Sequence, residues 1–139
     1  MTYADTRVDT ARASKRLHIT LWTVQILLAL VFAVTGLMKV TQPIEALAAS
    51  LAAVPLPLVR LIGVAELLGA AGLILPAATR IAPVLTPLAG LGLTIVMLLA
   101  SLLHLSRGEL TIALVPLVLG ALSALVAWGR WRRAPIPAR

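Results

Sequence analysis

The sequence predicts an all-α integral membrane protein built as a bundle of four transmembrane helices. Of its 139 residues, 60% are hydrophobic and only 12% are charged, and the mean hydropathy is +1.03. A soluble domain of this length needs far more polar surface to cover its core. The apolar residues also form long runs, such as the one from Ile26 to Val34. Transmembrane β-strands alternate apolar and polar residues, so these spans are predicted to be helices.

Proline, glycine and polar residues divide the apolar sequence into segments. The predicted spans cover residues 21–40, 58–75, 84–105 and 110–128. They form one bundle over residues 21–128, between an N-terminal segment, 1–20, and a basic tail, 129–139. The N-terminal segment is expected to fray and then form a short surface helix. A cleaved signal peptide is the alternative, because basic residues precede an apolar run there.

Two connections and one proline carry further predictions. Apolar residues at helical spacing between Ile44 and Pro57 predict a short helix at the membrane interface, with a plain loop as the alternative. Pro76 is expected to end the second span before a tight turn over residues 76–83. Pro116 is expected to kink the fourth span.

Lysine and arginine are distributed unevenly between the two sides of the predicted bundle. With four spans both termini share a side, and nine of the twelve basic residues fall on it. By the positive-inside rule, both termini are predicted to be cytoplasmic and the protein to lie in the bacterial cytoplasmic (inner) membrane. Because the net charge of +7 lies beside the spans, it favours anionic lipid over nucleic acid as a partner.

Glu66 places a carboxylate inside the predicted second span. A charge near the bilayer centre costs about 3 kcal/mol on insertion scales, so such a residue needs a partner, a polar cavity or a function. Lys39, Arg60 and His104 fall in the same outer half of the bundle. The sequence therefore predicts an outward-facing polar pocket with Glu66 at its floor. The inner half is expected to be apolar apart from hydroxyl groups and Gln25.

These residues admit more than one role. Glu66 either pairs with Lys39 or Arg60 to fix the helix register, or handles protons or a ligand. His104 is either an interfacial histidine bonded to backbone or a proton donor or acceptor to a ligand such as a quinone carbonyl. No metal site is expected, because His18 lies at the opposite end of the bundle and the chain has no cysteine.

Three short motifs together resemble the DoxX family of small four-helix membrane proteins. They are Gly36-Leu37-Met38-Lys39 at the end of the first span, Arg60-Leu61-Ile62-Gly63-Val64-Ala65-Glu66-Leu67-Leu68-Gly69 in the second, and His104 at the end of the third. The resemblance covers roughly residues 20–129. The positions that it carries over are Gly36, Lys39, Arg60, Gly63, Glu66, Gly69 and His104. It implies a four-helix bundle associated with membrane redox systems. Some relatives are subunits of a thiosulfate:quinone oxidoreductase, others are linked to oxidative-stress complexes, and many have no established activity.

The sequence and the resemblance leave three functional hypotheses. The first is a binding or accessory subunit of a membrane redox system, with a quinone or similar lipophile near Glu66 and His104. The second is a stand-alone enzyme in which Glu66 acts as a base and Lys39, Arg60 or His104 stabilises charge. The third is a purely structural assembly partner. The expected partners are membrane lipids and a membrane or periplasmic redox protein, and a homo-oligomer is left open.

Overall fold

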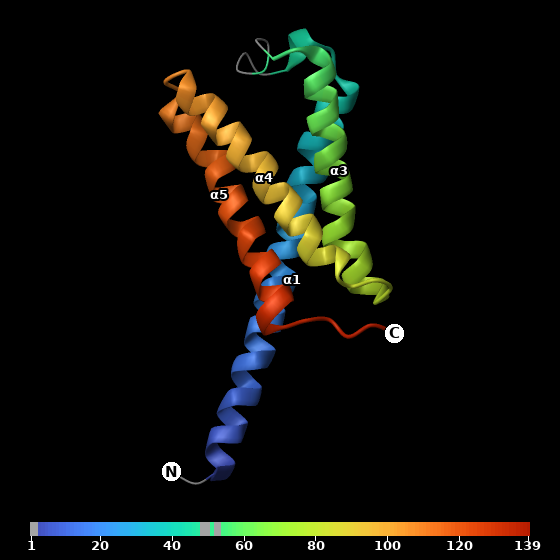
Figure 1. Ribbon diagram of the computed structural model, residues 1–139, viewed down its shortest axis with the longest axis vertical. Helices are drawn as coiled ribbons and strands as arrows, with labels where there is room; N and C mark the ends of the chain where they lie inside the picture. The colour runs from blue at the N-terminus through green and yellow to red at the C-terminus, as the bar shows by residue number, and fades with distance from the viewer. Residues whose placement is uncertain (1–2, 48–50, 52–53) are drawn as a thin grey trace.

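The computed structural model describes residues 3–47, 51 and 54–139 of the chain. All regular structure in these residues is helical (Figure 1). The long helices are α1 (Tyr3–Thr41), α3 (Leu56–Thr79), α4 (Leu85–Ser106) and α5 (Leu110–Trp128). The short ones are η1 (Ile44–Ala46), a 3₁₀ turn, and η2 (Gly129–Arg133), which continues α5 as a wider π-helical turn.

Four helical segments are long and apolar enough to cross a membrane, which confirms the predicted all-helical four-span architecture. They are Ser14–Thr41, Leu56–Thr79, Leu85–Ser106 and Leu110–Arg133. At about 1.5 Å per residue, even the shortest of these reaches across a hydrocarbon core of about 30 Å. Leucine, isoleucine and valine side chains cover much of their outer surface, as expected for helices that face lipid.

Two helix boundaries differ from the predictions. The backbone of α1 is continuous from Tyr3 instead of fraying before a separate surface helix, because no glycine or proline interrupts the chain before Gly36. The prediction that Pro76 ends the second span is wrong, because α3 continues through it to Thr79. Proline lacks the backbone N–H but still has a carbonyl group, and the Pro76 carbonyl oxygen accepts a hydrogen bond from the Arg80 N–H at 3.0 Å. The helix ends instead at Arg80, whose backbone is left-handed (φ 62°).

The connection between α1 and α3 packs against the bundle. Its described part contains η1, a single turn, and the rest of the predicted interfacial helix falls largely on residues 48–50 and 52–53, which lie outside the described residues. That helix is therefore not confirmed. Leu47 and Val54 are buried with Val59 of α3, and Leu51 and Leu103 pack against this cluster. The connection is thereby held to the ends of α3 and α4.

The four long helices form two pairs, α1 with α3 and α4 with α5, which separate toward one end (Figure 1). We call this end, which holds the α4–α5 turn, the open end, and the opposite end, which holds the α3–α4 turn, the closed end. Small residues allow the close approaches within and between the pairs. A Cβ added at Gly63 would lie 2.9 Å from the Gly36 carbonyl oxygen of α1, and one added at Gly90 would lie 2.9 Å from the Ser123 carbonyl oxygen of α5.

A buried polar bridge joins the two pairs at the closed end. The Gln25 amide donates to the Leu73 carbonyl oxygen of α3 at 2.6 Å, and Nε of Arg130 donates to Oε1 of Gln25 at 2.6 Å. The Arg130 guanidinium also lies over the Trp22 ring, 5.5 Å from its centroid. The half of the bundle that was predicted to be apolar apart from hydroxyl groups and Gln25 thus also holds the buried charge of Arg130, so this prediction is wrong. Because η2 carries the helix past Trp128, it turns Arg130 into the bundle instead of leaving it in a solvated tail.

Candidate functional site

A cavity of about 560 Å³ lies between the two helix pairs, toward the open end. All four long helices line it, together with Leu51 and Val54 of the connection between α1 and α3. Most of the lining side chains are apolar, including Phe32 and Met97, which also belong to the buried core. The polar side chains that line it are Thr35, Lys39, Glu66 and His104. The cavity therefore combines a lipophilic wall with a few hydrogen-bonding groups, as small-molecule sites do.

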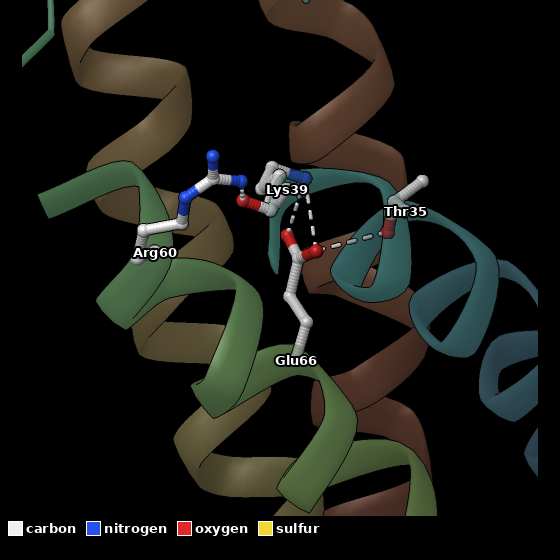
Figure 2. Close-up of polar contacts among 4 residues, drawn as sticks. All are labelled: Thr35, Lys39, Arg60 and Glu66. Carbon is white, nitrogen blue, oxygen red and sulfur yellow. Dashed lines mark hydrogen bonds and ion pairs between the residues drawn. The ribbon is translucent and has the colours of Figure 1, made fainter. Parts of the chain in front are cut away.

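Glu66 accepts hydrogen bonds from two side chains of α1 (Figure 2). Nζ of Lys39 lies 3.0 Å from Oε1 and 2.8 Å from Oε2, and the Thr35 hydroxyl donates to Oε2 at 2.9 Å. The Glu66 residue is only 2% exposed. A carboxylate buried this deeply needs both a counter-charge and hydrogen-bond donors, and α1 supplies them.

Local helix geometry explains how these three side chains meet. Thr35 and Lys39 are four residues apart, so they project from one face of α1. Gly63 is one turn before Glu66 on α3, and a Cβ there would lie 2.8 Å from the Lys39 Cβ. Glycine at this position lets α1 approach closely enough for a direct ion pair. The sequence left Lys39 and Arg60 open as partners of Glu66, and the structure selects Lys39.

Arg60 does not pair with Glu66, which was one of the roles considered for it. Its Nη1 donates to the backbone carbonyl oxygen of Lys39, not to Glu66 (Figure 2). That carbonyl belongs to the last turn of α1, where helix carbonyls lack a partner within the helix. Arg60 is also not among the described residues that line the cavity. Arg60 therefore caps the C-terminal end of α1 through the Lys39 backbone and does not contact Glu66 in the described hydrogen bonds.

His104 pairs with Glu109, which was not among the predicted site residues. Nδ1 of His104 lies 2.6 Å from Oε2 of Glu109, and the two side chains are 12% and 29% exposed. Gly108, with φ of 73°, turns the chain between them, and the Glu109 N–H bonds the His104 carbonyl oxygen at 3.0 Å. The sequence signal for this pair is the short spacing of His104 and Glu109, with Gly108 between them to form a turn. The partner is a carboxylate and not the backbone group considered as one alternative.

The polar groups of the cavity come from opposite helix pairs. Lys39 and Glu66 belong to the α1–α3 pair and His104 to α4, and all three line the same cavity. His18 lies instead at the closed end, where its ring nitrogens lie 3.1 Å from Arg130 Nη1 and 3.1 Å from the Trp22 indole nitrogen. Of the four predicted site residues, the structure thus brings Glu66, Lys39 and His104 to one cavity, and Arg60 is not among the described residues that line it.

A second hollow, of about 420 Å³, lies along α1 and α3 and is lined by alanine, leucine and isoleucine side chains without a charged group. This hollow is large enough for a small ligand, but its lining has no polar side chain to bind a polar group. The larger cavity has both the room and the polar side chains, with an ion pair and an imidazole at its wall. Its chemistry suits a lipophilic molecule with a polar head that accepts and donates hydrogen bonds.

Comparisons with known proteins agree with this architecture. A model of the DoxX-like family matches residues 23–126, which span the four helices and every residue of the candidate site. Comparisons with curated proteins and with solved structures gave no significant match. The family match covers well over half of the chain and agrees with the resemblance seen in its motifs. The chain therefore belongs to the DoxX-like family of membrane proteins.

Proposed function

We propose that the protein is a binding or accessory subunit of a membrane redox system and that its cavity holds a quinone-like lipophile. The observation that carries this proposal is the presence of the Lys39–Glu66 ion pair and His104 on the wall of one largely apolar cavity. A volume of about 560 Å³ lies within the range of small-molecule sites. Apolar walls suit the ring and tail of such a molecule. An ammonium group donates to an oxygen atom of its head, and an imidazole donates or accepts according to its tautomer.

The energetics of the ion pair support a ligand site. Removing two charges from water costs several kcal/mol per ion, and their mutual attraction often only offsets this cost. Two helices that need only to adhere in lipid can do so through small residues, as α1 and α3 already do at Gly36 and Gly63. A charged pair at a cavity wall can also bind a polar head, which gives it a function beyond packing.

The proposal also includes the side of the membrane that the cavity faces. Nine of the twelve basic residues lie on the side of the termini and the closed end, which favours a cytoplasmic location for both. The open end then faces the periplasm in a bacterial cytoplasmic membrane. A membrane or periplasmic redox protein is the expected partner at that face, and lipid surrounds the helices.

Equilibrium binding to the full chain in lipid nanodiscs tests the proposal, with decylubiquinone as the probe. Wild-type protein is expected to bind it saturably, and Glu66→Gln to weaken binding about tenfold, because the variant disrupts the ion pair that orients Lys39. Glu45→Gln is the matched control, because Glu45 is exposed on η1 and is not among the described residues that line the cavity. Absence of saturable binding, or equal binding by wild type and Glu66→Gln, contradicts the proposal.

The structural role remains the main competing hypothesis, because Lys39 and Glu66 join α1 to α3. It predicts that Glu66→Gln lowers the thermal stability or assembly of the protein and changes no ligand binding. Measuring the melting temperature of the same nanodisc samples separates the two hypotheses. A loss of affinity in a variant that melts close to the wild-type temperature supports the binding site.

A further inference from the structure

The contact between His104 and Glu109 determines which ring nitrogen of His104 carries a hydrogen. Nδ1 lies 2.6 Å from Oε2 of Glu109, a short distance typical of a hydrogen bond to a charged acceptor. An ionised carboxylate only accepts hydrogen bonds, so the hydrogen between them belongs to Nδ1. In a neutral imidazole the other nitrogen, Nε2, then has a free lone pair. In the neutral ring, the carboxylate therefore leaves Nε2 as a hydrogen-bond acceptor.

The position of the ring relative to the cavity gives this tautomer a consequence. His104 lines the cavity, whereas Glu109 is not among the described residues that do. Within the part of the chain that the structure describes, Nε2 of His104 bonds to no residue. The facing wall carries Lys39, whose ammonium group has a third N–H beyond the two that serve Glu66. The residues that line the cavity thus include one with a spare donor on one helix pair and one with a spare acceptor on the other.

We propose that Glu109 is a positioning residue that makes the cavity selective for a hydroxyl-bearing lipophile, the hydroquinone or phenol form, over the corresponding quinone. This inference rests on the proposed function. A hydroxyl group donates to the Nε2 lone pair and still accepts from an ammonium group. A quinone carbonyl has only lone pairs, so at Nε2 it meets another acceptor. Sites arranged to satisfy a ligand hydroxyl discriminate strongly against analogues that lack it.

The test compares the two redox forms of one probe on the same protein. Decylubiquinol and decylubiquinone are titrated separately, under anaerobic conditions, into the full chain in nanodiscs. Wild type is expected to bind the quinol more tightly. Glu109→Leu removes the acceptor and is expected to lower the preference for the quinol about tenfold, the effect of one lost hydrogen bond, while the affinity for the quinone holds or rises. Glu109→Gln keeps an amide oxygen that accepts from Nδ1 and is expected to lower the preference less. Glu45→Gln is the control and keeps the wild-type preference, because it removes an exposed carboxylate outside the lining.

A spectroscopic readout follows the tautomer without any ligand. In protein labelled with ¹⁵N-histidine, His104 is expected to show a protonated Nδ1 and an unprotonated Nε2, and Glu109→Leu to shift it toward the opposite tautomer. His18→Gln assigns the two signals, since the chain has two histidines.

Three results overturn the inference. A protonated Nε2 in the wild-type protein removes its premise. Equal weakening of quinol and quinone in both Glu109 variants assigns Glu109 a merely structural role in the α4–α5 turn and leaves the proposed function standing. Failure of wild type to bind either form overturns the proposed function, and with it the selectivity, whatever the tautomer of His104.

Discussion

At the scale of single residues, Glu66 is the group whose environment is most completely specified. Within the described part of the chain, its two oxygens accept three hydrogen bonds, and all the donors come from α1. Lys39 is held from the opposite side by Arg60, which bonds the Lys39 backbone carbonyl oxygen. The charge pair and its supports are therefore organised around one helix contact. This arrangement supplies the buried carboxylate with a counter-charge and hydrogen-bond donors at the wall of a largely apolar cavity.

Thr35 provides the mildest perturbation of that environment. Thr35→Val removes the hydroxyl that donates to Oε2 of Glu66 at 2.9 Å and keeps the branched shape of the side chain. We expect it to lower the free energy of unfolding by about 1 kcal/mol, because a buried carboxylate loses a donor. Thr41→Val is the control, since among the described residues the exposed Thr41 hydroxyl bonds only the Leu37 carbonyl oxygen of its own helix. Equal thermal stability of the two variants in one detergent would refute the expectation.

At the scale of helices, glycine decides how closely the elements approach. A Cβ at Gly63 would lie 2.8 Å from the Lys39 Cβ and 2.9 Å from the Gly36 carbonyl oxygen. Neither contact can be relieved by rotating the end of a flexible side chain. The α1–α3 spacing, and with it the ion pair, therefore depends on the absence of a side chain at this position.

Gly63→Ala tests this dependence. The added methyl group is expected to force α1 from α3 and cost about 1–3 kcal/mol, the usual penalty for overpacking. Gly92→Ala is a matched control within a helix, since a Cβ there meets no described atom within 4 Å. It should be neutral or stabilising because alanine favours helix more than glycine. The measurement is the melting temperature of each variant, and a control that melts below Gly63→Ala would contradict the account.

The elements also show which parts of the structure could be predicted from sequence. Long apolar runs were enough to predict the four helices. The cost of a charge in lipid was enough to select Glu66. Lys39 and His104 followed because they lie at the ends of spans in the same half of the bundle as Glu66. Glu109 was not predicted because it lies at a helix end near water, where a charged side chain has little desolvation cost and so gives no sequence signal. The Arg130–Gln25 bridge joins residues 105 positions apart, and only the path of η2 brings them together. Local patterns contain no information on such a contact.

At the scale of the whole molecule, the two helix pairs meet at the closed end and separate toward the open end (Figure 1). The buried bridge from Leu73 through Gln25 to Arg130 holds the closed end together. The cavity occupies the space between the pairs on the other side of the core. Access to it is therefore expected from the open end and from the surrounding lipid, and not through the closed end.

The orientation of the molecule in the membrane can be measured directly because the chain has no cysteine. We predict that Ser106→Cys, at the open end, reacts with a membrane-impermeant maleimide added to intact cells. Thr79→Cys, at the closed end, is expected to react only after the cells are opened, because the basic closed end is predicted to be cytoplasmic. The reverse pattern of labelling would invert the proposed topology.

The central claim is that the cavity, and not the lipid-facing surface, binds the lipophile. Photolabelling with an azidoquinone in nanodiscs, followed by peptide mapping, tests it most directly. The account predicts that labelling concentrates on cavity-lining residues of α4 and α5, such as Leu103 and Leu119, and that excess decylubiquinone and Glu66→Gln both reduce it. Labelling spread evenly over the outer faces of the helices, or unchanged by competitor, would contradict it.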